Sequence, residues 1–170
     1  MSLVTAPTGV RRGARSLDGL RAGIRRPAVV AGVLSAYAGA LHLYVVPVHL
    51  RAWWGYGAFF LAVGIFQVLH GLVVARRPGT ALALAGILGN VAVVGIYVLS
   101  RTNGVPVGPA HSGHRLERAG VLDLTATAVE VALIAVLVTL LPARTGRITI
   151  NVLLMTGVGL WALRLSGLLA

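Results

Sequence analysis

The chain has no cysteine and no lysine, and only four of its 170 residues are acidic. The lack of cysteine excludes disulfide bonds, thiolate metal sites and cysteine nucleophiles. A metal site would have to use His, carboxylate or Met side chains, and Met1 and Met155 are the only methionines. Charged residues make up 11% of the chain, less than half of the roughly 25% found in soluble domains. The composition therefore argues against a soluble globular protein.

What the chain does contain is a series of apolar runs, each about the length that crosses ~30 Å of hydrocarbon. We predict an all-α fold, a polytopic bundle of five transmembrane helices joined to a flexible basic tail at residues 1–26 and a polar outer loop at residues 101–120. The first run is too long for the apolar region of a signal peptide. Pro47 and Pro142 are expected to end or kink helices. The predicted spans are 27–46, 52–75, 80–100, 121–141 and 148–170.

The net charge of +11 comes entirely from Arg, and nearly all of it lies at the ends of apolar runs. That placement favours loops near anionic lipid and argues against nucleic acid as a partner. On the predicted topology, ten Arg lie on the side of the N-terminal tail and four on the other side. The positive-inside rule then predicts a cytoplasmic N-terminus and an outer C-terminus. An alternative has four spans, with residues 148–170 lying flat or packed loosely.

Small residues recur at spacings that suit close helix packing in lipid. Gly57, Gly64 and Gly71 are seven residues apart and lie on one stripe, and Ala85 and Gly89 are four apart on the next helix. Small residues let helix backbones approach closely in membranes. We expect both sets to be packing surfaces.

Glu130 is predicted near the middle of its helix, where an ionisable group costs about 2.5–3.5 kcal/mol unless it finds a partner. Asp123 lies seven residues earlier on the same face. Arg164 on the last helix could pair with either carboxylate. The structural interpretation is an ion pair that holds the last two helices together, and the functional one is a carboxylate that carries a proton or cation.

Three further polar residues lie within the predicted spans, namely Gln67, His70 and Asn90. Hydrogen bonds between helices are the common role of such residues. A haem-ligand role for His70 or His42 is the alternative. The two are expected in opposite halves of the membrane, so they could not bind the same iron.

The remaining histidines gather on the predicted outer side, together with two acidic residues. Imidazole and carboxylate ligands suit transition metals such as Cu or Zn, although no His-Glu-x-x-His motif is present. We therefore consider an outer site for a transition metal, with solvated histidines as the alternative. Its candidate ligands are His42, His49, His111, His114 and Asp123, with Glu117 nearby.

Two stretches, residues 42–67 and 101–130, resemble small multi-pass membrane proteins of unknown function from actinobacteria. The pattern consists of His, aromatic, Gly-Pro and acidic positions and covers about a third of the chain. The resemblance implies a helical fold in a bacterial plasma membrane, and it carries no activity.

Three functions stay open. The first is a non-catalytic subunit or sensor whose outer His and acidic cluster binds a metal ion or a partner. The second is a small proton- or cation-coupled transporter that uses Glu130, for which five helices are few unless the chain forms a homo-oligomer or joins a membrane complex. The third is a membrane oxidoreductase. No nucleophile elbow, P-loop or zinc-protease motif supports an enzyme.

Overall fold

The structure, a computed structural model, describes residues 9–102, 104, 107–108 and 119–166, without the side chains of residues 9–22 and Arg164. The described part consists of helices and contains no strand. It therefore confirms the all-α prediction. The helices are α1 (Gly9–Ala52), α2 (Trp54–Arg76), α3 (Thr80–Thr102), α4 (Val121–Thr139) and α5 (Ala143–Leu165).

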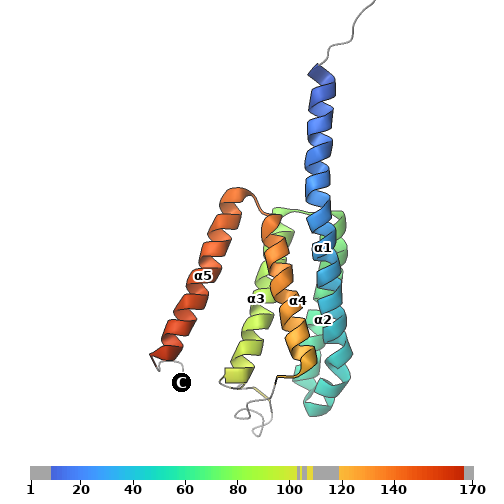
Figure 1. Ribbon diagram of the computed structural model, residues 1–170. Coiled ribbons are helices and arrows are strands. Elements are labelled where there is room, and N and C mark those ends of the chain that lie inside the picture. The colour runs from blue at the N-terminus through green and yellow to red at the C-terminus, as the bar shows by residue number, and fades with distance from the viewer. Residues whose placement is uncertain (1–8, 103, 105–106, 109–118, 167–170) are drawn as a thin grey trace, which may run out of the picture.

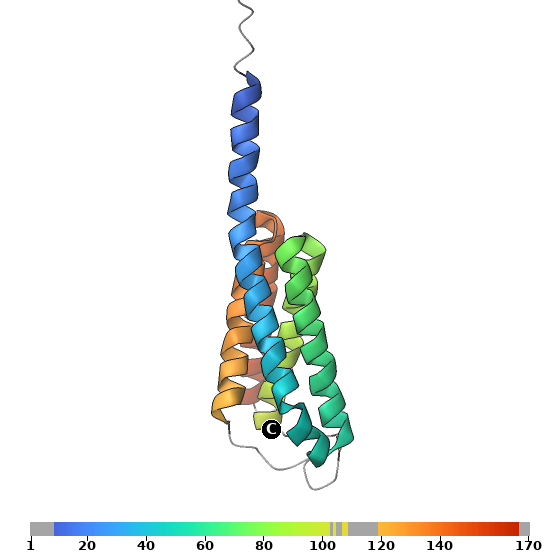
Figure 2. The same cartoon turned by 90° about the vertical axis from the view of Figure 1, so that its right-hand side faces the viewer.

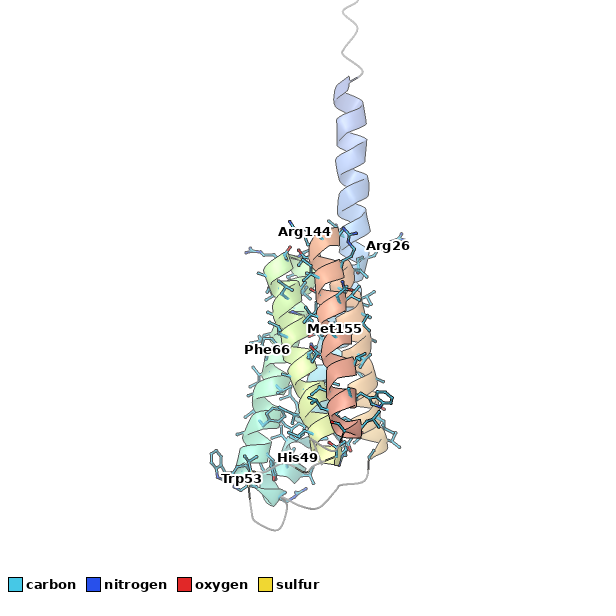
Figure 3. All side chains as sticks on the ribbon, turned by 90° about the vertical axis from the view of Figure 1, so that its left-hand side faces the viewer. Arg26, His49, Trp53, Phe66, Arg144 and Met155 are labelled. Atoms are coloured by element: carbon cyan, nitrogen blue, oxygen red, sulfur yellow. The ribbon has the colours of Figure 1, made fainter. Side chains whose placement is uncertain are left out.

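All five helices are long and apolar enough to cross a membrane, as the sequence predicts. They run alternately up and down (Figure 1), so that each connection joins neighbouring helix ends. One end of the bundle carries Arg26 and Arg144, and the other carries His49 and Trp53 (Figure 3). We call them the Arg144 end and the Trp53 end.

Four of the helices form a closed group, seen from the side in Figure 2. α1 lies between α2 and α4 and contacts both, and α3 contacts α4 and, less extensively, α2. Leu133 and Leu137 of α4 are fully buried within this group, together with Val74 of α2 and Ala83 of α3. α4 therefore supplies buried leucines to the core between its neighbours α1 and α3.

Helix α1 is longer than the sequence suggests, because it begins at Gly9 and continues past both of its prolines to Ala52. Its first turns project beyond the other helices at the Arg144 end (Figure 1). Proline removes one helix hydrogen bond, but neighbouring polar groups can compensate within a membrane bundle. Near Pro47, His49 Nδ1 lies 2.8 Å from the Val45 oxygen one turn earlier, an added polar contact within this helix. The expected end of this helix at Val46 is therefore wrong.

The closest helix contact joins α1 to α2 through four glycines, Gly32, Gly39, Gly64 and Gly71, which we call the glycine contact. A Cβ added to Gly71 would lie 2.6 Å from the Gly32 oxygen, and one added to Gly39 would lie 2.7 Å from the Gly64 oxygen. No side chain fits between backbones at these distances. The predicted stripe on α2 is thus a packing surface, and its partner is α1.

Helix α5 packs differently from the rest, because α4 is the only described helix that it contacts. It stands apart from the others in Figure 1. Most of its large apolar side chains are exposed, including Met155, Trp161 and Leu165. In a membrane these side chains would face lipid.

We expect Gly71→Ala to lower the free energy of unfolding by about 1–3 kcal/mol, because its Cβ would overlap the α1 backbone. The matched control is Gly95→Ala on α3, where an added Cβ has nothing within 4 Å. That variant should be unchanged or more stable by up to about 1 kcal/mol. Reversible unfolding in mixed micelles measures both, and equal effects would contradict the close approach of α1 and α2.

Candidate functional site

Two deeply buried ionisable groups, His42 of α1 and Glu130 of α4, meet inside the closed group of helices. His42 Nε2 lies 2.8 Å from Glu130 Oε1, and the two residues are 5% and 1% exposed. Gln67 Nε2 donates a second hydrogen bond to the same carboxylate oxygen at 3.1 Å. Glu130 therefore has an imidazole partner on one neighbouring helix and an amide donor on another.

Asn90 of α3 completes this group, which we call the buried polar cluster (His42, Gln67, Asn90 and Glu130). Its Nδ2 donates to the Gly86 oxygen at 2.7 Å, within its own helix. That bond turns Asn90 Oδ1 toward Gln67, whose Nε2 donates to it at 3.0 Å. The cluster thus links all four helices of the closed group.

The orientation of the Gln67 amide follows from these neighbours. Asn90 Oδ1 and Glu130 Oε1 both accept hydrogen bonds, so the Gln67 atom between them must be the nitrogen. Both of its hydrogens are then used. Gln67 Oε1 is buried and has no hydrogen-bond partner.

A second set of polar contacts lies beside the cluster, toward the Arg144 end. The Ser35 hydroxyl donates to the Gln67 backbone oxygen at 2.7 Å and lies 3.2 Å from His70 Nδ1. His70 Nε2 lies 3.0 Å from the Leu82 oxygen. A side chain at Gly86 would collide with this ring, because an added Cβ would lie 2.5 Å from His70 Cε1. The glycine therefore makes room for the imidazole between α2 and α3.

The cluster lies well inside the bundle. Glu130 is nine residues from the start of α4, and His42 is ten residues from the end of α1. At about 1.5 Å per residue, both lie roughly 14 Å from the Trp53 end. Ionisable groups at such depth need partners or a wet cavity, and here each is the partner of the other.

The other ion pair of the described residues is more exposed and lies at the Trp53 end. Arg101 donates to Asp123 Oδ2 at 2.7 Å, with side chains 17% and 38% exposed. The same carboxylate oxygen accepts the Gly120 N–H at 3.0 Å, at the start of α4. The Arg101 guanidinium also lies 5.1 Å from the centre of the Tyr97 ring. These contacts hold α3 to the first turn of α4.

The predicted metal ligands do not converge where the structure describes them. His42 is paired with Glu130, Asp123 with Arg101, and His49 with a backbone oxygen. No three His, Asp or Glu side chains of the described residues could hold a metal ion together. His111, His114 and Glu117 lie outside the described residues, so their part in an outer Cu or Zn site stays a prediction.

The structure brings Glu130, Gln67 and Asn90 together and adds His42, which the sequence places too near the outer surface. The error comes from ending the first helix at Val46. With α1 continuing to Ala52, His42 moves to the depth of Glu130. The structure does not describe the Arg164 side chain, so its expected pairing with Glu130 or Asp123 stays a prediction. Both carboxylates have other partners, His42 and Arg101.

Comparisons with protein-family models, curated proteins and solved structures find no match for this chain. The resemblance to actinobacterial membrane proteins therefore stays a prediction. Any function has to be argued from the geometry of the site itself.

We expect the His42–Glu130 pair to show strong energetic coupling, because removing one partner of a buried pair costs about 3–5 kcal/mol. A double-mutant cycle with His42→Ala and Glu130→Ala, measured by reversible unfolding, should give a coupling above about 2 kcal/mol. The same cycle with Arg101→Ala and Asp123→Ala is the control, and a smaller coupling, about 1 kcal/mol, is expected for that less buried pair. Similar coupling in both cycles would contradict the central role of the buried pair.

Proposed function

We propose that this chain is a small proton-coupled transporter of a bacterial plasma membrane and that the His42–Glu130 pair carries the proton. The supporting observation is an imidazole held 2.8 Å from a carboxylate, both almost fully buried among apolar helices. Ionisable residues inside membrane spans are costly and usually functional, and carboxylates and histidines form the proton relays of many pumps and transporters.

The chemistry of the pair suits one proton per cycle. With neutral His42 donating its Nε2–H to ionised Glu130, the pair carries one negative charge. Uptake of one proton by the Glu130 carboxylate makes the pair neutral overall. Proton uptake lowers the free-energy cost of keeping a charge inside the bilayer. Each proton that binds or leaves therefore changes the stability of this arrangement of helices.

Gln67 and Asn90 have a positioning role in this proposal. Gln67 donates to Glu130, while Asn90 accepts from the Gln67 amide and holds it in place. Protonation of Glu130 weakens the bond from Gln67, because a neutral carboxyl group is the poorer acceptor. A change of charge on α4 is thereby passed to α2 and α3.

Polar groups continue from the pair toward both ends of the bundle. Toward the Trp53 end, Thr127 precedes Glu130 by one helical turn on α4. Toward the Arg144 end, Ser35 and His70 lie beyond Gln67. These groups supply the polar path that a carrier needs, and a homo-oligomer would add the helices that five spans lack.

In proteoliposomes with an imposed pH gradient, we expect Glu130→Gln to abolish protein-dependent proton flux, because the amide cannot take up a proton. Asp123→Asn is the matched control: it makes the same change on the same helix at an exposed position, and it should keep most of the flux. Infrared difference spectra after a pH jump should contain a carboxylic acid band that is lost only in Glu130→Gln. An unchanged spectrum and unchanged flux in folded Glu130→Gln protein would refute the proton role.

The Arg-rich Arg144 end is proposed to face the cytoplasm and its anionic lipids. Because the chain has no cysteine, single cysteines report topology without background. We expect Ala119→Cys, at the Trp53 end, to react with an impermeant maleimide in right-side-out vesicles. Gly79→Cys, in the exposed turn at the Arg144 end, should react only after permeabilisation. The reverse pattern would invert the proposed orientation.

A further inference from the structure

A second histidine of α1 lies between the buried pair and the Trp53 end. His49 follows His42 by seven residues on the same uninterrupted helix, so the two imidazoles are about 10 Å apart along it at about 1.5 Å per residue. His49, labelled in Figure 3, lies at the Trp53 end of the bundle. It is partly exposed there, whereas His42 is 5% exposed.

The ring of Phe60, from α2, lies between these two imidazoles. Its centre is 5.6 Å from the centre of the His42 ring and 4.0 Å from that of the His49 ring. Together these distances span nearly the whole spacing of the two histidines along α1. A phenyl ring can neither accept nor release a proton. Phe60 therefore separates the buried pair from the more exposed histidine.

The hydrogen bonds of the two histidines leave one ring nitrogen of each available for a proton. His49 Nδ1 lies 2.8 Å from the Val45 oxygen, which can only accept, so Nδ1 carries the hydrogen and Nε2 keeps its lone pair. When Glu130 is ionised, His42 donates its Nε2–H to it, and His42 Nδ1 keeps its lone pair. A proton that binds His42 Nδ1 then allows the Nε2 hydrogen to pass to Glu130 Oε1, and the imidazole ends neutral.

The other ionisable side chains described near the Trp53 end have contacts or surroundings of their own. Arg51 follows His49 on α1 and is exposed. Arg101 of α3 and Asp123 of α4 pair with each other. The Tyr56 hydroxyl of α2 donates to the Val107 oxygen. His49 is the ionisable group that shares a ring neighbour with the buried pair.

We propose that protons enter and leave at the Trp53 end through His49 and that Phe60 controls their passage to the His42–Glu130 pair. This inference rests on the proposed proton role of Glu130 and names the route to it. With the Phe60 ring between the imidazoles, His49 exchanges protons with water and the pair is closed off. When the ring turns aside, water enters between them and carries a proton from His49 Nε2 to His42 Nδ1.

The rate at which the Glu130 carboxylic acid exchanges its proton for a deuteron tests this route. At the acidic pH at which its infrared band is present, the protein in nanodiscs is mixed rapidly with deuterated buffer of the same acidity, and the shift of the band is followed. The band is assigned by its loss in Glu130→Gln. Exposed carboxyl groups exchange within the mixing time, so the slow component reports the buried site.

Exchange that requires a local opening becomes faster when the opening costs less, so Phe60→Ala should exchange at least about tenfold faster than the original protein. Phe59→Ala is the matched control, because it removes the neighbouring ring of α2, which lines the apolar groove toward α3. Its rate should stay close to that of the original protein. Phe60→Met keeps a long apolar side chain between the histidines and should also exchange slowly.

His49→Gln keeps a donor for the Val45 oxygen but cannot bind a proton, so it should slow exchange at least about tenfold, the lower range of general acid–base effects. This comparison stands on its own if Phe60→Ala does not fold. The inference is overturned if the acid band is present but Phe60→Ala exchanges no faster than Phe59→Ala, or if His49→Gln exchanges at the original rate. Absence of the band would refute the proton role of Glu130 and this inference with it.

Discussion

The arrangement of the helices depends on one constraint, the need of a carboxylate inside an apolar bundle for partners. Glu130 is 1% exposed, so its carboxylate needs hydrogen-bond donors from other helices. His42 provides one and Gln67 the other. Because these partners come from α1 and α2 while Asn90 adds α3, satisfying one side chain on α4 fixes the relative position of four helices.

The glycine contact makes that arrangement geometrically possible. Gly39 and Gly64 bring the backbones of α1 and α2 together between His42 and Gln67. A wider spacing would move the imidazole and the amide apart, and they could not both reach one carboxylate oxygen. The apolar packing and the polar cluster are therefore parts of one design. Helix α5 contributes to neither, since it contacts only α4 among the described helices.

Much of the fold can be predicted from sequence, because span length and hydropathy are local properties. The five helices and the packing stripe on α2 follow from such patterns. The site is harder to predict, since it depends on relative depth across helices. Pro47 suggests a helix end, but α1 continues through it to Ala52. The longer helix moves His42 from the expected outer surface to the depth at which it pairs with Glu130. Likewise, Asp123 pairs with Arg101, because the end of α3 lies beside the start of α4; the sequence did not point to this partner.

The continuity of α1 has a mechanical consequence. Residues 9–22 form its projecting part, about 21 Å long at about 1.5 Å per residue, and they belong to the same uninterrupted helix as His42. A continuous helix links the positions of its two ends, apart from the bend that Pro27 allows between the extension and the bundle. A shift of α1 within the bundle would therefore also move the basic extension beyond the Arg144 end.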